Sequence, residues 1–271
     1  MRPGASVAVR RAVIAGTIIA VVVPLVVLVV WSLAHRWLWP ALLPESLSAR
    51  AWSYVISDAA GLLPAFLNSL GIALAVTVLC VVLGVPAGRA LGSMRLGIRS
   101  WLMLLVLLPL IAPGLAVAMG LHVMFIRAGL SGTRIGVIIV HLVPALPYMI
   151  LVTTAVFAGL DARLEEQARS LGAGPFQAFR LVTLPVVMPG IVTGSLFVFL
   201  ISWTQYVLTL LIGGGRIQTL PVLLFAFASA GDTSLTAAMS VVFLAPALVI
   251  LVGTGRYIKG SAIGMSAAGK M

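Results

Sequence analysis

The chain has 271 residues, of which 62% are hydrophobic and 8% are charged, and its mean hydropathy is +1.21. A soluble globular domain cannot carry such a composition, so these values exclude that class. The net charge of +11 comes from basic residues scattered between apolar runs, without a basic patch for nucleic acid. We therefore expect an integral membrane protein.

Six apolar runs follow one another along the chain. A membrane helix needs about 20 apolar residues to cross a hydrocarbon core about 30 Å thick. The first run is longer than the roughly 7–15 apolar residues of a cleaved signal peptide, so we expect it to remain as a membrane anchor. The six expected helices cover residues 12–34, 67–91, 101–125, 135–160, 186–212 and 236–253.

The basic residues indicate the orientation, because Lys and Arg are retained on the cytoplasmic side of short connections. With the N-terminus inside, cytoplasmic segments hold twelve of the seventeen basic residues, and the opposite side holds five. We therefore expect both ends of the chain in the cytoplasm. The expected organisation is an N-terminal segment 1–11, a six-helix domain 12–255 with a cytoplasmic loop 161–185, and a C-terminal tail 256–271.

Little in the sequence points to catalysis or to a metal site. Cys80 is the only cysteine, so an intramolecular disulfide or a thiolate metal site is impossible, and the three histidines lack the paired spacing of metal ligands. His122 and His141 fall inside expected spans, where an imidazole either lines a solute path or bonds to a neighbouring helix. We expect no metal and no catalytic residue.

The sequence also limits how a transport process could be driven. No Asp, Glu, Lys or Arg lies near the centre of an expected span, which disfavours coupling to protons or ions. A phosphate-binding loop needs Gly-Lys-Ser/Thr, and neither Lys259 nor Lys270 precedes Ser or Thr. We expect this chain to bind no cofactor, so any ATP and Mg²⁺ must be bound by a partner ATPase.

Residues 161–185 form a charged, amphipathic segment in an otherwise apolar sequence. Asp161 is suited to cap a short helix. One face of this helix is charged, and on it Glu165 and Arg169 are spaced for an ion pair one turn apart. The apolar face has the helical period and carries Leu164, Ala168 and Leu171.

Gly172 and Gly174 end this helix, and Pro175 fits the first position of a second short helix that carries Phe176 and Phe179. Two helices with exposed aromatic side chains suit insertion into a groove of another protein. An amphipathic pair resting on the bilayer surface has the same pattern. The pattern alone leaves both interpretations open.

The run Glu166-Gln167-Ala168 is followed by Gly172 and, after nine further residues, by Val182-Thr183-Leu184-Pro185. This pattern resembles the EAA loop of inner-membrane permeases of binding-protein-dependent ABC transporters. That signature reads Glu-Ala-Ala, three residues, Gly, nine residues, then Ile, any residue and Leu-Pro. The chain departs from it mildly at Gln167, where Ala is usual, and at Val182, where Ile is usual. The resemblance is to the spermidine and putrescine permease branch and extends from about Asn68 into the sixth span. The matching residues are Glu166, Ala168, Gly172, Leu184 and Pro185.

The resemblance implies an all-α membrane bundle of the MetI-like type with six transmembrane helices. In the family, the EAA loop forms a coupling helix that docks into a cleft of a cytoplasmic ATPase subunit. The residues expected to couple to the ATPase are Glu166, Gln167, Ala168, Gly172, Pro175, Phe176, Phe179, Leu184 and Pro185.

Alternating access needs two permease bundles around one path, and this chain has only one. The resemblance therefore implies a second permease subunit, identical or related, two ATPase subunits and an extracytoplasmic solute-binding protein. The permease itself contacts membrane lipid, and we expect no nucleic acid. The expected docking surface for the binding protein consists of the stretches from His35 to Phe66 and from Gly213 to Leu235.

The sequence leaves the solute open. In the fifth span, Thr204 and Gln205 stand where polyamine permeases look to have acidic residues, so a neutral or anionic polar solute fits as well. The side chains of Thr204 and Gln205 can equally form interhelical hydrogen bonds. Trp203 and Tyr206 can stack on a solute or serve as interfacial anchors. Polyamines, sugars, thiamine, iron and phosphonates all remain candidates. The candidate path residues are Asn68, His122, His141, Trp203, Thr204, Gln205 and Tyr206.

Two other classes of protein share parts of this pattern. An intramembrane enzyme needs a catalytic set at depth, whereas the span centres offer only isolated histidines. A secondary transporter driven by ions or protons is the main alternative, but such proteins are usually longer, with an internal repeat and intramembrane charges.

Overall fold

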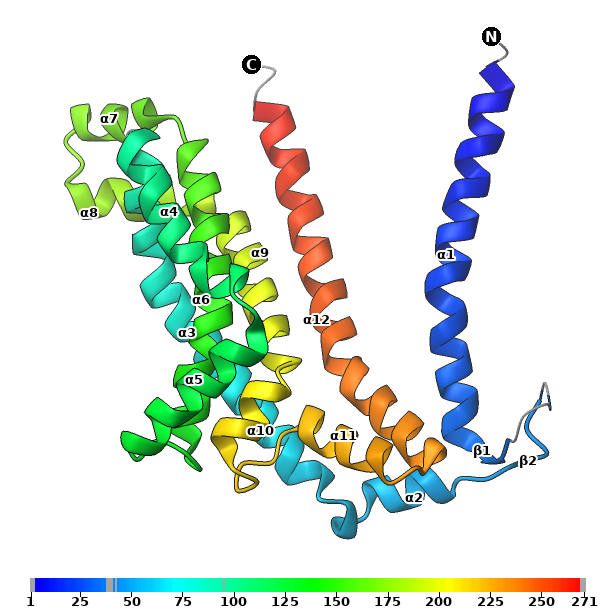
Figure 1. Ribbon diagram of the computed structural model, residues 1–271. Helices are drawn as coiled ribbons and strands as arrows, with labels where there is room; N and C mark the ends of the chain where they lie inside the picture. The colour runs from blue at the N-terminus through cyan, green and yellow to red at the C-terminus, as the bar shows by residue number, and fades with distance from the viewer. Residues whose placement is uncertain (1–2, 38–40, 42, 95, 269–271) are drawn as a thin grey trace. The chain divides into compact units, whose positions relative to one another are not determined.

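The computed structural model describes residues 3–37, 41, 43–94 and 96–268, and it is almost entirely helical (Figure 1). Its described part contains five apolar helices long enough to cross a membrane and one pair of apolar helices joined by a bend. The six expected spans are present when this pair counts as one, which confirms the all-α membrane fold. The chain forms two compact units, residues 1–63 with 223–246 and residues 64–222 with 247–271.

The first unit begins with a long helix whose described side chains are mostly exposed and apolar, as expected of a helix that faces lipid or another subunit. Two short antiparallel strands follow, with Ala34 opposite Leu47. The elements of the unit are α1 (Pro3–Leu33), β1 (Ala34–Arg36), β2 (Ser46–Leu47), α2 (Arg50–Ile56), the 3₁₀ turn η1 (Asp58–Ala60), most of α11 (Leu220–Ser229) and the first part of α12 (Thr233–Ala268).

An ion pair connects α2 to the turn before α12. The Arg50 guanidinium donates to the Asp232 carboxylate at 2.8 Å, and Asp232 also caps α12 by accepting from the Leu235 backbone N–H at 3.0 Å. Burial alone raises the pKa of the Asp232 carboxyl. The hydrogen bonds from Leu235, Arg50 and Ser234 outweigh that effect and lower the pKa below its ordinary value, so this carboxylate stays charged at neutral pH.

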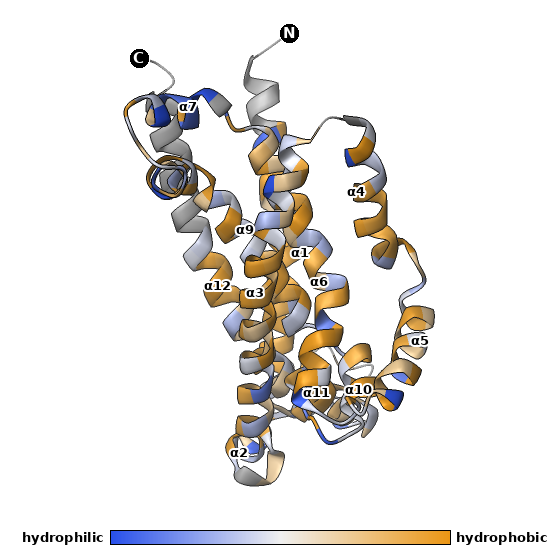
Figure 2. Cartoon of the chain, turned by 90° about the vertical axis from the view of Figure 1, so that its left-hand side faces the viewer, coloured by the Kyte–Doolittle hydropathy of each residue, from blue (hydrophilic) through white to orange (hydrophobic). Residues whose placement is uncertain are grey.

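The second unit is a helical bundle. In Figures 1 and 2, α7 lies at one end of the bundle made by α3, α6 and α9, and α10 lies at the other end. The elements are α3 (Leu62–Ser93), α4 (Leu96–Ile111), α5 (Gly114–Arg127), α6 (Arg134–Ala158), α7 (Ala162–Ser170), α8 (Pro175–Ala178), the π-helical turn η2 (Phe179–Thr183), α9 (Leu184–Trp203) and α10 (Val207–Gly213).

Two expected helices are broken. The third span, expected as one helix, bends by 91° between α4 and α5. Pro113 cannot donate a backbone hydrogen bond and disfavours the helical conformation at Ala112, so the helix stops there and restarts at Gly114. The fifth span, expected to continue to Ile212, ends at Trp203, and α10 starts a new helix at Val207.

Helix α6 lies between glycine-rich faces of α3 and α9. A methyl group at Gly84 would come within 2.6 Å of Met149 Cγ, and one at Gly88 would overlap Thr153. On α9, a methyl group at Gly194 would lie 2.9 Å from the Met149 sulfur. Small residues at four-residue spacing allow membrane helices to pack backbone to backbone. The sequence carries this signal, which a hydropathy pattern does not reveal, at Gly84, Gly88, Gly92, Gly190 and Gly194.

This packing predicts unequal effects of the same substitution within α3. Gly88→Leu should overpack the α3–α6 contact at a cost of about 2 kcal/mol and lower the Tm of the detergent-solubilised protein by about 5 °C. Gly71→Leu, on the same helix, is the control, because nothing lies within 4 Å of its added methyl group. The Tm of each variant is measured by heating the protein and monitoring its aggregation by fluorescence size-exclusion chromatography. Equal Tm values for the two variants would show that the contact contributes nothing.

Candidate functional site

The segment 161–185 folds as the sequence predicts. The Asp161 carboxylate accepts from the Arg163 backbone N–H at 3.0 Å and caps α7. Gly172 has a φ of +91°, in the left-handed region that side chains rarely adopt, and it turns the chain after α7. Gly174 is extended, and Pro175 is the first residue of α8. The first helix, its cap and the turn are confirmed, but the second helix is not a separate short one, because it continues into the fifth span.

Two large apolar side chains of this segment are strongly exposed, whereas Ala168 on the same apolar face is half-buried. Leu171 is 89% exposed and Phe176 is 74% exposed, and Leu164 is exposed beside them. In Figure 2, α7 contains hydrophilic residues, whereas the helices of the bundle are mostly hydrophobic. Phe179, expected to be exposed like Phe176, instead turns inward and packs with the buried cluster under the loop. The exposed apolar surface therefore centres on Leu171 and Phe176.

Glu165 attaches α7 to α3. Its two carboxylate oxygens each accept from Arg89 Nη2 at 3.1 Å, and Oε2 also accepts from the Thr183 hydroxyl at 3.2 Å. The Arg89 guanidinium lies over the Phe179 ring, 4.7 Å from its centroid. The expected pair between Glu165 and Arg169 is not among the ion pairs of the described residues. We call Arg89, Glu165, Phe179 and Thr183 the loop clamp.

The segment runs into the membrane without a helix break. Helix α8 passes through the π-helical turn η2 directly into α9, so residues Pro175–Trp203 form one continuous 29-residue helix. π-helical turns accommodate an extra residue and often mark functional positions. The loop is thus joined to α9 through the main chain and to α3 through the loop clamp.

A cavity of about 270 Å³ lies where the two broken spans meet α6. Backbone that leaves the helical conformation at membrane depth is tolerated where it is buried in protein or lines a water-filled cavity. The lining carries no charge, and Gln205 supplies its polar side chain. The described lining residues are Pro109, Gly114, Leu115, Val117, Ala118, Val143, Pro144, Gln205, Val207 and Leu208.

The other candidate path residues of the fifth span do not line this cavity. Thr204 is exposed, and its hydroxyl donates to the Leu200 carbonyl of its own helix at 2.8 Å. Trp203 is 1% exposed and stacks on Phe199, with ring centroids 5.7 Å apart, so it cannot stack on a solute in this conformation. Tyr206 is partly buried outside the lining.

The candidates on other helices are also placed elsewhere. Asn68 donates its side-chain amide to the Gln218 carbonyl at 2.9 Å and joins α3 to the segment before α11. His122 is half-buried on α5, outside the cavity lining. His141 is 1% exposed, with both ring nitrogens within hydrogen-bonding distance of hydroxyl groups. Gln205 alone of the seven candidates lines the cavity.

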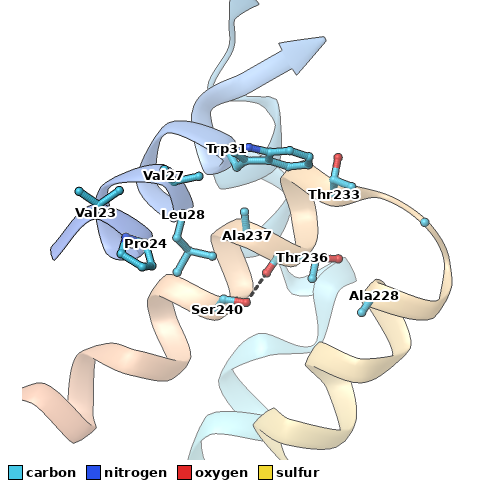
Figure 3. Close-up of a pocket in the computed structure, with 11 residues that line it drawn as sticks. Val23, Pro24, Val27, Leu28, Trp31, Ala228, Thr233, Thr236, Ala237 and Ser240 are labelled. Carbon is cyan, nitrogen blue, oxygen red and sulfur yellow. Dashed lines mark hydrogen bonds between the residues drawn. The ribbon is translucent and has the colours of Figure 1, made fainter. Parts of the chain in front are cut away.

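A larger hollow, of about 690 Å³, lies in the first unit (Figure 3). Its walls are apolar side chains of α1, including Val23, Leu28 and Trp31, and residues from the turn before α12 and its first turns. The Ser240 hydroxyl that faces it donates to the Thr236 carbonyl of the same helix at 2.8 Å. This surface suits apolar packing rather than recognition of a polar solute.

Comparison with known proteins relates this chain to membrane permeases. Residues 81–255 match the family described as the binding-protein-dependent transport system inner membrane component. The chain is 32% identical over 202 residues to the trehalose transport system permease protein SugB of Mycobacterium tuberculosis, covering 72% of this chain and 74% of that protein. It is 29% identical over 238 residues to the putative 2-aminoethylphosphonate transport system permease protein PhnV of Salmonella typhi, covering 87% of this chain and 89% of that protein.

A third relative is the spermidine/putrescine transport system permease protein PotB of Haemophilus influenzae, 34% identical over 167 residues, or 55% of this chain and 58% of that protein. Among solved structures, a bacterial ABC transporter involved in the import of the acidic polysaccharide alginate matches with a TM-score of 0.71 and 18% identity, over 95% of this chain and 98% of that chain. A bacterial alginate ABC transporter in complex with an alginate pentasaccharide-bound periplasmic protein matches with a TM-score of 0.60 and 17% identity, over 91% and 92%.

The structural likeness confirms the predicted MetI-like permease fold. The sequence match covers well over half of the chain, and the spans identify a multi-pass protein of the inner membrane. The chain therefore belongs to the family of binding-protein-dependent transport system inner membrane components and is a permease of an ABC importer.

Proposed function

We propose that this permease forms half of a solute path and is driven by a separate cytoplasmic ATPase, which binds ATP and Mg²⁺ and docks on the segment 161–185. The exposed apolar surface around Leu171 and Phe176 carries this proposal. Both side chains are largely exposed, yet the segment that carries them is joined to α9 through the main chain and to α3 through the loop clamp. An amphipathic helix inserted into a partner's groove buries such a face.

The proposed assembly contains a second permease, two ATPase subunits and an extracytoplasmic binding protein. With the ATPase-docking loop in the cytoplasm, both ends of the chain are cytoplasmic as well. The stretches from His35 to Phe66 and from Gly213 to Leu235 then face the binding protein. The alginate transporter in complex with a periplasmic protein supports such a partner.

For the solute, we propose a polar molecule that meets Gln205 in the cavity between the broken spans. An uncharged lining offers hydrogen bonds but no counter-charge for a polycation, which disfavours a polyamine. The relatives are named for trehalose, 2-aminoethylphosphonate and spermidine/putrescine, so membership of the family leaves the class open. Broken helices commonly form solute sites in transporters.

The ATPase-docking proposal is tested by purifying the tagged chain from native membranes in mild detergent and identifying the bound proteins by mass spectrometry. We expect an ATPase, a second permease and a binding protein. With the double variant Leu171→Ser/Phe176→Ser, the amount of co-purified ATPase should fall about tenfold, since buried anchor residues dominate interface energies. The second permease should stay bound. Arg169→Ala, on the charged face, is the control. Recovery of the chain alone, with the loop open to protease, would favour the membrane-surface interpretation.

The turn at Gly172 should be necessary for coupling. Gly172→Val forces a β-branched residue into a φ of +91°, a strain of about 1–3 kcal/mol, although no atom lies within 4 Å of the added methyl group. Gly174→Val is the control, because Gly174 has an ordinary φ of −66° and equally open space. We expect Gly172→Val to insert normally but to lose stimulation of the ATPase by the binding protein, whereas Gly174→Val keeps it. Normal stimulation and uptake with Gly172→Val would contradict this role.

The loop clamp should contribute to coupling through α3. Arg89→Glu and Glu165→Arg each place like charges together, and we expect either to reduce stimulated ATPase activity about threefold to tenfold, the scale of a partly exposed ion pair with a cation–π contact. The double variant Arg89→Glu/Glu165→Arg should restore part of the activity. The measurement is ATPase activity of the purified complex with and without binding protein. No recovery in the double variant would show that the charges act separately.

A further inference from the structure

A buried polar network connects the two halves of the broken fifth span. His141, on α6, lies with Nδ1 2.9 Å from the Ser202 hydroxyl in the last turn of α9 and with Nε2 2.9 Å from the Thr209 hydroxyl in α10. All three side chains are buried. The imidazole therefore bridges the break from one side, while Thr204, Gln205 and Tyr206 form the break itself.

The hydrogen bonds define one consistent proton arrangement. The Thr209 hydroxyl donates to the Gln205 carbonyl at 2.9 Å, so it accepts from His141 Nε2–H. Because a charged group is costly in this buried position, the imidazole is assigned as neutral, and Nδ1 then accepts from the Ser202 hydroxyl. The chain of donors runs from Ser202 through His141 and Thr209 to the backbone of Gln205. The imidazole is thus connected to the residue that lines the cavity.

We propose that His141 is a positioning residue that holds the break between α9 and α10 and thereby keeps Gln205 in the solute path. This rests on the proposed function, in which the cavity belongs to that path. His141 is itself buried outside the lining, and its hydrogen-bonded chain through Thr209 ends at the Gln205 carbonyl. A buried polar side chain that bridges two half-helices fixes their relative position, since removing it takes this partner from the Ser202 hydroxyl and leaves the Thr209 hydroxyl bonded only to the Gln205 carbonyl of its own segment.

The test uses the reactivity of a cysteine at position 205 and does not need the solute. Cys80 is the single native cysteine, so Cys80→Ala gives a background without cysteine. In this background, Gln205→Cys is labelled in native membranes with a membrane-impermeant methanethiosulfonate, and the rate is compared between His141 and His141→Leu. We expect the rate to change by about tenfold, and His141→Gln, which can both donate and accept, to bring it back within about threefold.

A matched control separates local repositioning from general loosening. Gln218→Cys, at an exposed position between α10 and α11, should be labelled at the same rate whichever residue occupies position 141. If His141→Leu fails to reach the membrane, Ser202→Ala removes the bond between His141 and α9 without touching Gln205 and should change the rate at position 205 as well.

Each outcome decides a separate point. Labelling of Gln205→Cys at one rate in all variants would overturn the positioning role while leaving the path in place. A parallel change at position 218 would overturn it as well, because the effect would then be a general loss of structure. Absence of labelling with His141 intact would remove Gln205 from a water-filled path, and both the path and the inference would fail.

Discussion

The close packing of α6 between α3 and α9 is the constraint on which the rest of this structure depends. In a membrane, apolar side chains gain nothing by leaving lipid for another helix, so association relies on van der Waals contact at short range. Glycines spaced one turn apart on α3 and α9 allow that approach, with Met149 fitting against both Gly84 and Gly194. The three-helix core that results positions the segment 161–185 at one end and the break between α9 and α10 at the other (Figure 1).

The same membrane environment explains why the break carries hydroxyl groups. Where the helix stops, backbone carbonyls lose their helical partners, and an unsatisfied group in hydrocarbon costs several kcal/mol. The Gln205 N–H bonds to the Ser202 carbonyl instead of the Ile201 carbonyl, and the Thr204 hydroxyl donates to that Ile201 carbonyl at 3.4 Å. Beyond the break, Thr209 donates its hydroxyl to the Gln205 carbonyl. These side chains replace what the backbone gives up, so the main chain can leave the helix beside the cavity.

Local patterns in the sequence predicted the features that depend on local physics. Composition indicated the six spans, and the cap at Asp161, the left-handed turn at Gly172 and the helix start at Pro175 follow from short-range rules that the structure confirms. Glu165 could not be placed in this way, because its partner Arg89 lies 76 residues away in the sequence, whereas Arg169 satisfies the local spacing. The bend before Gly114 had a signal in Pro113 that hydropathy alone ignores. The break at Thr204 has no Pro or Gly near it, and the hydrogen bonds beside it join His141 to Ser202 and Thr209, which lie 61 and 68 residues away in the sequence.

The attachments of the segment 161–185 determine how movement at its surface can reach the cavity. The segment is fixed to α6 by a short connection, to α9 by a continuous helix and to α3 by the loop clamp, and these three helices are already locked by the glycine contacts. Bending one helix would break those contacts, so displacement of α7 is transmitted by the three helices together. Helix α9 has 20 residues and is about 30 Å long. Under the proposed function, an ATPase that moves the loop would also move the Gln205 end of α9, together with α3 and α6.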